Sequence, residues 1–289
     1  MNSIYRTTLT ALQRDMSEGE ARAMAFLILE DAFGIRRIDV YADKVKDFSP
    51  NEAARLQNIL ERVHRGEPVQ YVLGRALFCG RYFRVTPATL IPRPETEELV
   101  ALVVDDAKAA APAGILDVGT GTGCIAVSLK LALPSVPVAA WDISRTALTV
   151  AEENAQTLGA AVDFAERDIT KAPPQLIAEG GLSGEVVVSN PPYVMEKEKA
   201  DMERHVLDWE PATALFVPDD DALRFYRSLA AVARYGRAAG VYCEINAALG
   251  QETMDVFRAA GYADVSLVQD GCGRDRFVRA RCLSASASR

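Results

Sequence analysis

The sequence has very little histidine, no paired cysteines and no long apolar run. Its two histidines, His64 and His205, stand far apart, which argues against a histidine-based metal cluster or catalytic triad. We therefore expect no metal site. The five cysteines are scattered and form no C-x-x-C pair, a pattern typical of reduced thiols in a cytosolic protein. These absences indicate a cytoplasmic protein that is held together by its core rather than by disulfides.

Signals for a membrane or for nucleic acid are also missing. No apolar run approaches the roughly 20 residues that span a bilayer, and the start of the chain has no signal-peptide core. The formal net charge is −8. We therefore expect no membrane contact and no stable nucleic-acid partner, although a local basic patch would still permit one. A hydrophobic share of 49% indicates a globular protein, for which a monomer is the default.

The first part of the chain carries helix-type patterns. In residues 1–70, an apolar stripe from Ala21 to Leu29 ends at Phe33-Gly34. Ser49-Pro50-Asn51-Glu52 combines a capping residue, a proline and an acid, which together begin another helix. We predict a small helical domain here. Residues 71–92 are predicted to form a β-hairpin linker, because glycines break their short β-prone runs: Tyr71–Leu73, Leu77–Phe78 and Tyr82–Val85.

From residue 93 to residue 283, strands and helices alternate. The alternation predicts an α/β fold, a mostly parallel sheet with helices on both faces. The last two strands have no helix between them and should be antiparallel. Residues 284–289 are small and polar, and we predict a disordered tail. The predicted strands are 115–118, 136–141, 161–165, 186–188, 240–244, 265–268 and 276–281.

A glycine loop follows the first of these strands. Asp117 ends the strand, and Gly119-Thr120-Gly121-Thr122-Gly123 comes directly afterwards. Glycines allow a tight turn and let a ligand approach the backbone. The G-x-G-x-G pattern alone is weak evidence, because dinucleotide-binding proteins share it. An acid before the glycines would repel a pyrophosphate, but it could accept hydrogen bonds or stabilise a cation.

Two further acids end the next two strands. Asp142 follows Trp141 and could accept both hydroxyls of a ribose, and Asp168 could accept a hydrogen bond from an adenine amino group. Each Asp alone fits a helix cap or a turn equally well. Three acids at successive strand tips beside a glycine loop instead describe a pocket for a nucleoside with positive charge. S-adenosylmethionine, with its sulfonium, meets that description.

The fourth strand ends in Ser189-Asn190-Pro191-Pro192-Tyr193. Prolines end a strand because they lack an N–H, and in isolation an Asn-Pro turn is more often an ordinary loop. At this place in the chain it should face the same pocket as the acids. The Asn190 side-chain oxygen and the Pro191 carbonyl could then accept both hydrogens of a planar NH₂ group. They would aim its lone pair at the methyl group, with Tyr193 stacked on the plane.

Together these motifs resemble the class I methyltransferases that act on planar amino groups. Within them the chain closely resembles the HemK/PrmC family, the protein-glutamine N5-methyltransferases of peptide chain release factors. The resemblance covers about residues 66–281, and the helical N-terminal region fits in type. Besides the acids, the loop and the turn, it is carried by Glu67–Gly74, Leu90–Glu97, Ile115–Ile125, Trp141–Ser144, Asn154-Ala155, Glu210-Pro211, Ala214-Leu215 and Tyr226-Arg227.

The resemblance implies a Rossmann-like sheet of seven strands and methylation of the glutamine in the Gly-Gly-Gln motif of release factors. It implies that Asn190, Pro191 and Tyr193 are catalytic. The residues it assigns to S-adenosylmethionine are Asp117, Gly119, Thr120, Gly121, Thr122, Gly123, Asp142, Ile143, Asp168, Ile169 and Asn190. Those assigned to the protein substrate are Asn190, Pro191, Pro192, Tyr193, Arg93 and Glu95.

Two stretches depart from the family pattern. Phe216–Asp221 replaces the glycines that usually precede an acid, and Glu244-Ile245-Asn246 replaces the usual Glu-x-Gly. We expect neither stretch to touch the catalytic turn. We expect these two departures to alter the rim of the site and its loops, and not the methyl-transfer chemistry.

Three alternatives stay open. A related enzyme acting on a glutamine of a ribosomal protein is poorly separated by sequence. A methyltransferase for an exocyclic amine of DNA or RNA would use the same turn on a flipped base, but the acidic balance and the lack of a basic recognition domain argue against it. An inactive S-adenosylmethionine-binding adaptor is opposed by the intact turn from Asn190 to Tyr193.

Overall fold

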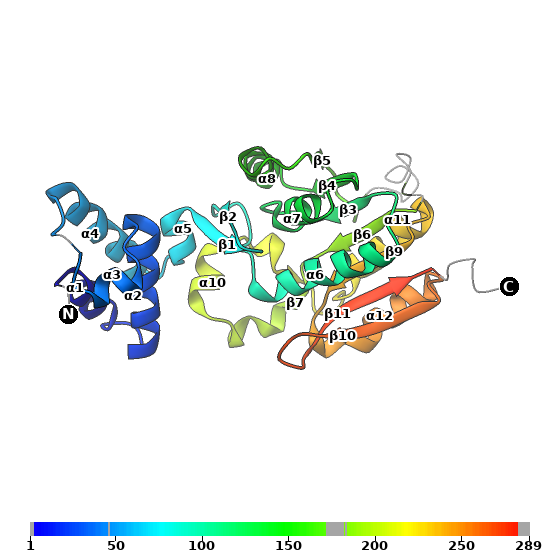
Figure 1. Ribbon diagram of the computed structural model, residues 1–289. Coiled ribbons are helices and arrows are strands. Elements are labelled where there is room, and N and C mark those ends of the chain that lie inside the picture. The colour runs from blue at the N-terminus through cyan, green and yellow to red at the C-terminus, as the bar shows by residue number, and fades with distance from the viewer. Residues whose placement is uncertain (1–2, 46, 172–181, 183, 283–289) are drawn as a thin grey trace. The chain divides into compact units, whose positions relative to one another are not determined.

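The computed structural model describes residues 3–45, 47–171, 182 and 184–282 (Figure 1). Two compact units make up the chain: residues 1–75 with 203–209, and residues 76–202 with 210–289. The predicted domain limits at residues 70 and 92 stay predictions, and the predicted tail lies outside the described residues. Within the described ranges, no helix is both long enough and apolar enough to cross a membrane.

The first unit is helical, as the sequence predicts. Its core packs residues such as Phe26 and Leu29 against Ile59 and Leu60. Ser49 caps the N-terminus of its helix, because its hydroxyl accepts from the Glu52 N–H at 3.3 Å while the Glu52 carboxylate accepts from the Ser49 N–H at 2.8 Å. The helices of this unit are α1 (Ser3–Leu12), α2 (Glu18–Phe33), α3 (Arg37–Tyr41), α4 (Pro50–His64), α5 (Val69–Leu73) and α10 (Arg204–Trp209).

The predicted hairpin is confirmed over β1 (Arg75–Phe78) and β2 (Arg81–Arg84), which form a two-stranded sheet. The prediction that Tyr71–Leu73 is β-like is wrong, because these residues belong to α5. A run of three apolar residues has no periodicity that separates a strand from a single helical turn. Gly74 then ends that turn with a φ of +75°, in the left-handed region.

The second unit is built on a seven-stranded sheet in the order β10-β11-β9-β6-β3-β4-β5 (Figure 1). Strands β9, β6, β3, β4 and β5 are parallel to their neighbours in this order, and β11 is antiparallel to both β9 and β10. The predicted mostly parallel sheet is therefore confirmed. The strands are β3 (Ile115–Val118), β4 (Val138–Asp142), β5 (Asp163–Glu166), β6 (Val186–Ser189), β9 (Gly240–Glu244), β10 (Asp264–Gln269) and β11 (Asp275–Arg281).

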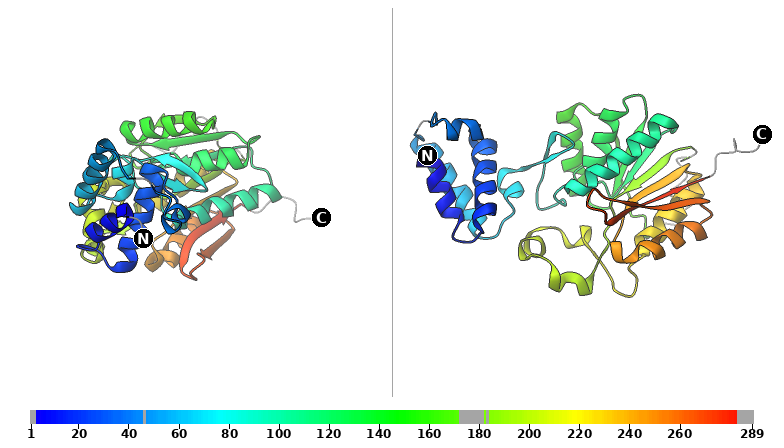
Figure 2. Two further views of the ribbon diagram at one scale, coloured as in Figure 1. Left: turned by 60° about the vertical axis from the view of Figure 1, so that its left-hand side comes forward. Right: turned by 60° about the horizontal axis from the view of Figure 1, so that its bottom comes forward.

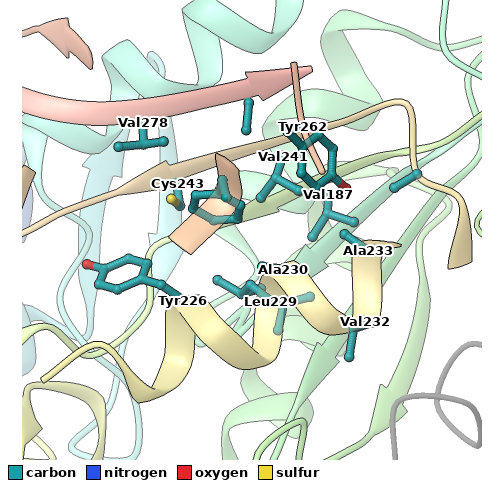
Figure 3. Packing of buried hydrophobic residues seen from close by; sticks show 14 of the residues in the cluster. Val187, Tyr226, Leu229, Ala230, Val232, Ala233, Val241, Cys243, Tyr262 and Val278 are labelled. Atoms are coloured by element: carbon teal, nitrogen blue, oxygen red, sulfur yellow. The ribbon is translucent and has the colours of Figure 1, made fainter. Parts of the chain in front are cut away.

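Helices cover both faces of this sheet (Figures 1 and 2). Ile115 packs with α6 and α7, whereas Leu116 packs with α11 and α12, because successive side chains of a strand point to opposite faces. Figure 3 shows Leu229 of α11 beneath Val187 and Val241 of the sheet, and Tyr226 of the same helix beneath Cys243. The helices are α6 (Pro94–Ala109), α7 (Cys124–Ala132), α8 (Arg145–Leu158), α11 (Arg224–Gly236) and α12 (Gly250–Ala259).

Short elements follow the turn after β6. Strands β7 (Val194–Met195) and β8 (Phe216–Val217) form a parallel pair apart from the main sheet. Between and after them lie short 3₁₀ helices, which are η1 (Glu196–Asp201), η2 (Ala212–Ala214) and η3 (Ala247–Leu249). The pairing fixes the chain that leaves Tyr193, so the turn before it is anchored on both sides.

Buried Asn154 joins the hairpin to the glycine loop. Its Oδ1 accepts from the Arg84 N–H at 2.7 Å, and its Nδ2 donates to the carbonyls of Arg84 and Thr122 at 3.0 and 2.9 Å. Helix α8 therefore holds the end of β2 and the middle of the loop with a single amide. Both the acceptor and the donor side of that amide are used.

Replacing Asn154 should be costly. Asn154→Ala leaves one N–H and two carbonyls without their partner, and we expect it to lower the free energy of unfolding by about 3 kcal/mol. Asn154→Asp keeps the acceptor but turns a carboxylate oxygen toward two carbonyls, so it should destabilise at least as much. Urea unfolding of both variants checks this. An aspartate variant as stable as the wild type would contradict the described hydrogen bonds.

Candidate active site

The predicted residues meet at one edge of the sheet. Strands β6, β3, β4 and β5 lie side by side and run in the same direction, so their carboxyl ends share that edge. Direct contacts join the tips: the Gly121 N–H donates to Asp142 Oδ2 at 2.8 Å, and Ser189 Oγ donates to the Val118 carbonyl at 2.7 Å. The structure thus brings together the glycine loop, Asp142 and the turn after Ser189.

The three glycines of the loop serve two purposes. All have positive φ, at +74° for Gly119, +55° for Gly121 and +78° for Gly123. A Cβ on Gly123 would lie 3.1 Å from the Cβ of Ala151, so this glycine allows α8 to pack against the loop. A Cβ on Gly119 or Gly121 would meet no atom within 4 Å. The backbone at these two positions therefore borders open space.

Asp117 is fully buried beneath the loop. Its Oδ2 accepts from Thr120 Oγ1 at 2.6 Å and from the Ala126 N–H at 3.2 Å, while its Oδ1 is buried without a partner in the described chain. Burial raises the pKa of this carboxyl to about 7, and the two hydrogen bonds oppose the rise. The structure shows Asp117 organising the loop and the start of α7.

Asp142 fastens the glycine loop to the beginning of α8. Oδ2 accepts from the Gly121 N–H and Oδ1 from the Ser144 N–H, each at 2.8 Å. Burial raises the pKa of Asp142, and the hydrogen bonds from the backbone oppose this rise. The next residue, Ile143, is 54% exposed. This strand tip therefore offers a carboxylate with an apolar side chain beside it.

Asp168 closes its own turn after β5. Its Oδ1 accepts from the N–H and the hydroxyl of Thr170, at 2.9 and 2.7 Å. Burial alone would raise the pKa of Asp168, but the hydrogen bonds of Thr170 and the charge of Lys171 leave it lowered. The half-buried Ile169 packs against the core on the α11 side. The tip of β5 is therefore a preformed turn with an ionised carboxylate.

The turn after β6 contacts Thr96 and Glu244, which the sequence analysis did not assign to the site. Asn190 Nδ2 donates to Thr96 Oγ1 at 3.1 Å, and Thr96 Oγ1 donates to Glu244 Oε2 at 2.7 Å. The Tyr193 hydroxyl donates to Glu244 Oε1 at 2.8 Å. The available signals were a threonine in the first turn of α6, directly after the proline-flanked segment, and an acid at the end of the buried strand β9.

Burial raises the pKa of the Glu244 carboxyl. Hydrogen bonds from Thr96 and Tyr193 and the charge of Arg276 oppose this rise. Burial and the neighbouring carboxylate raise the pKa of the Tyr193 hydroxyl. Tyr193 is therefore a hydrogen-bond donor that stays protonated, not a base.

Arg93 and Glu95 lie just before and within the first turn of α6. Arg93 Nη2 donates to Glu210 Oε1 at 2.6 Å, and the Ile91 N–H donates to the other oxygen of that buried carboxylate at 3.1 Å. Glu210 thus fixes the proline-flanked segment. Glu95 is exposed. Of the two predicted substrate contacts, one already forms an ion pair within the fold and the other faces solvent.

The expectation that both departures from the family pattern avoid the catalytic turn is wrong for Asn246. Its Nδ2 donates to the Tyr193 carbonyl at 3.3 Å and to Glu198 Oε2 at 2.9 Å. The contact arises because β9 pairs with β6, so the chain leaving β9 borders the turn. Asp219 accepts from the Lys197 N–H at 3.0 Å, farther along the chain.

The sheet order, the glycine loop and the polar strand tips define the class I methyltransferase fold. Among solved structures, the hMettl16 catalytic domain in complex with MAT2A 3′UTR hairpin 6 aligns over 84% of this chain and 85% of that chain, with a TM-score of 0.55. The sequence identity is 15%, so this likeness concerns the fold alone.

Sequence comparisons show to which family of methyltransferases the chain belongs. The model of the PrmC N-terminal domain matches residues 7–74, and that of the methyltransferase small domain matches residues 98–208. The chain is 44% identical to the release factor glutamine methyltransferase of Bacteroides thetaiotaomicron, covering 97% of this chain and 99% of that protein. It is 34% identical to the one of Flavobacterium psychrophilum, over 95% and 97%. The chain belongs to the release factor glutamine methyltransferase family.

Asp117 should make stability depend on pH. Its folded pKa of about 7 exceeds the ordinary value of 3.8, so the folded state keeps a proton that the unfolded chain has released. The resulting stability is complete below the ordinary pKa and is lost as pH rises toward about 7. Asp117→Asn removes this loss. We expect the variant to gain in free energy of unfolding relative to the wild type between about pH 4 and about pH 7, which urea titrations would measure. A difference that stays constant with pH would contradict the burial of this carboxyl.

Proposed function

We propose that this protein transfers the methyl group of S-adenosylmethionine to the side-chain amide nitrogen of the glutamine in the Gly-Gly-Gln motif of peptide chain release factors. One observation carries the proposal. The Asn190 side chain gives its NH₂ group to Thr96, which leaves its oxygen to accept from a substrate amide. The full-length relationship to release factor glutamine methyltransferases supports the same substrate.

The residues around the glycine loop fit the cofactor. Open space borders Gly119 and Gly121, where a nucleoside with its amino-acid end would lie against the backbone. Asp117 Oδ1 is a buried acceptor without a partner in the described chain, which suits a positively charged ligand. Each oxygen of Asp142 accepts one N–H and keeps a lone pair for a ribose hydroxyl.

The remaining predicted cofactor contacts extend this site along the edge. Ile143 offers apolar surface for a planar base, and the turn of Asp168 and Ile169 would border the same base. Thr120 and Thr122 complete the loop. When bound, S-adenosylmethionine supplies an electrophilic methyl group. We assign to this chain the tasks of binding the cofactor, orienting the amide and stabilising charge.

The turn after β6 would orient the nucleophile. The lone pair of an amide nitrogen is delocalised, so the nitrogen must be held with its lone pair toward the methyl group. Asn190 Oδ1 and the Pro191 carbonyl accept its two hydrogens and stabilise the positive charge that develops on nitrogen. The Tyr193 ring stacks on the amide plane, while Pro191 and Pro192 keep the turn rigid. Water suffices to take the proton once the product has formed.

Outside the turn, the release factor would meet the segment before α6. Glu95 is exposed in the first turn of that helix and lies next to Thr96 in sequence. The side chain of Arg93 keeps 33% of its area exposed although it pairs with Glu210. We assign both residues to contacts with the protein substrate. We further propose that the enzyme works as a cytoplasmic monomer, in keeping with its free cysteines.

A glutamine of a ribosomal protein is the alternative substrate, since the turn itself recognises only a planar NH₂ group. Exocyclic amines of DNA or RNA satisfy the same geometry. The net charge of −8 disfavours a nucleic acid. Family membership favours the release factor over both.

The substrate assignment predicts a specific labelling pattern. With S-adenosylmethionine labelled in its methyl group, a full-length release factor should become labelled, and the release factor with its Gly-Gly-Gln glutamine changed to alanine should not. A ribosomal protein and DNA serve as parallel substrates. Label on DNA, or label that persists in the alanine-substituted release factor, would overturn the assignment.

Asn190→Ala should separate chemistry from cofactor binding. Removing the acceptor for the amide hydrogens should lower kcat by about 100-fold or more, because the lone pair is no longer aimed and the charge on nitrogen is no longer stabilised. The Kd for S-adenosylmethionine, measured by calorimetry, should change by only about two- to threefold, since one contact at the edge of that site is lost. Equal losses in both quantities would instead make Asn190 a residue of the cofactor site.

A further inference from the structure

Glu244 reaches both polar side chains of the turn. One of its carboxylate oxygens accepts directly from the Tyr193 hydroxyl at 2.8 Å. The other accepts from Thr96 Oγ1 at 2.7 Å, and that hydroxyl accepts from Asn190 Nδ2 at 3.1 Å. Glu244 is 1% exposed and Thr96 is 2% exposed, so water does not compete for these bonds. A single buried carboxylate thus sets the position of the amide and of the ring.

The direction of these bonds follows from the number of hydrogens available. A threonine hydroxyl has one hydrogen, and an ionised carboxylate has none. Because Thr96 gives its hydrogen to Glu244, it can only accept from Asn190. The NH₂ end of Asn190 must therefore face Thr96, and Oδ1 must lie on the other side of the amide. Within the described chain Oδ1 forms no hydrogen bond, so it is available as an acceptor.

The opposite orientation would harm the reaction. If Asn190 were turned over, its NH₂ group would face the substrate amide, which also presents hydrogens. Nothing would then accept the substrate hydrogens on that side, and the charge that develops on nitrogen would meet a donor. An amide is nearly symmetrical in shape, so packing alone does not choose between the two orientations. Only the hydrogen-bond partners of Asn190 can choose.

Glu244 itself is held in place. The Tyr226 hydroxyl donates to its main-chain carbonyl at 3.2 Å, and Phe277 of β11 lies opposite it in the sheet. Asn246, two residues later, holds the Tyr193 carbonyl. The carboxyl end of β9 therefore supports the turn through a side chain at Glu244 and through the main chain of Tyr193. Support of this kind preorganises a site before substrate arrives.

We propose that Glu244 and Thr96 are positioning residues for methyl transfer: the Glu244 carboxylate orients the Thr96 hydroxyl, which turns the oxygen of Asn190 toward the substrate amide, and it also fixes the ring of Tyr193. The proposal rests on the proposed function, in which Asn190 accepts the hydrogens of that amide. Neither residue touches the reacting atoms. Their effect should therefore fall on kcat and spare the binding of cofactor and release factor.

The test compares Thr96→Val with Thr96→Ser in the full-length enzyme. Valine has the shape of threonine without the hydroxyl, and serine keeps the hydroxyl. We expect Thr96→Val to lower kcat about 10- to 100-fold with KM for the release factor and Kd for S-adenosylmethionine within about threefold of wild type. Thr96→Ser should restore kcat to within about threefold of wild type. If Thr96 served only for packing, valine, which has the shape of threonine, would preserve kcat better than serine does.

Wild-type kcat in Thr96→Val, or an equal loss in Thr96→Ser, would overturn the proposal. Melting temperatures are measured for both variants. Should Thr96→Val fail to fold, Glu244→Gln replaces it. The glutamine NH₂ group must face either the Thr96 or the Tyr193 hydroxyl, so one of the two hydroxyls loses its acceptor. Wild-type kcat in that variant would equally refute the proposal. A wild-type enzyme without activity on release factors would refute the proposed function instead, so the two failures are distinguishable.

Discussion

The direction and order of the parallel strands are the constraint on which the rest of the site depends. Because β6, β3, β4 and β5 are adjacent and parallel, residues separated by up to about seventy positions end at one edge. The hydrogen bond from Ser189 to the Val118 carbonyl and the one from Gly121 to Asp142 join these ends directly. The helices support this edge by contacts to its loops. Asn154 of α8, for example, donates a hydrogen bond to the glycine loop.

Two buried carboxyl groups lie beneath the loop and the turn. Asp117 and Glu244 are 0% and 1% exposed, and burial raises the pKa of each. Both accept from a threonine hydroxyl, which is Thr120 for Asp117 and Thr96 for Glu244. An ionised carboxylate accepts several bonds and gives none, so Glu244 in that form fixes the direction of the Thr96 and Tyr193 hydroxyls. A buried carboxyl group therefore orders the glycine loop after β3, and another orders the turn after β6.

Much of this was predictable from the sequence, because local rules decide it. The glycine loop, the acids at strand tips and the Ser49 helix start depend on neighbours in the chain. Tyr71–Leu73 was mistaken for a strand because a run so short has no period. The roles of Thr96 and Glu244 depend on a contact between residues 148 positions apart, and that of Asn246 on the pairing of β9 with β6. Strand order is a tertiary property, so neither role could follow from spacing.

The choice of substrate lies outside the turn, and the chemistry explains why. Asn190 and the Pro191 carbonyl recognise two hydrogens on a planar nitrogen, which glutamine, adenine and guanine all present. Selection must therefore come from groups that meet the rest of the substrate. At the start of α6, Arg93 is held by Glu210, and Glu95 in the first turn is left exposed, so the exposed position there is acidic. A phosphate backbone would be repelled by that carboxylate, whereas a protein loop does not bring such a row of negative charges.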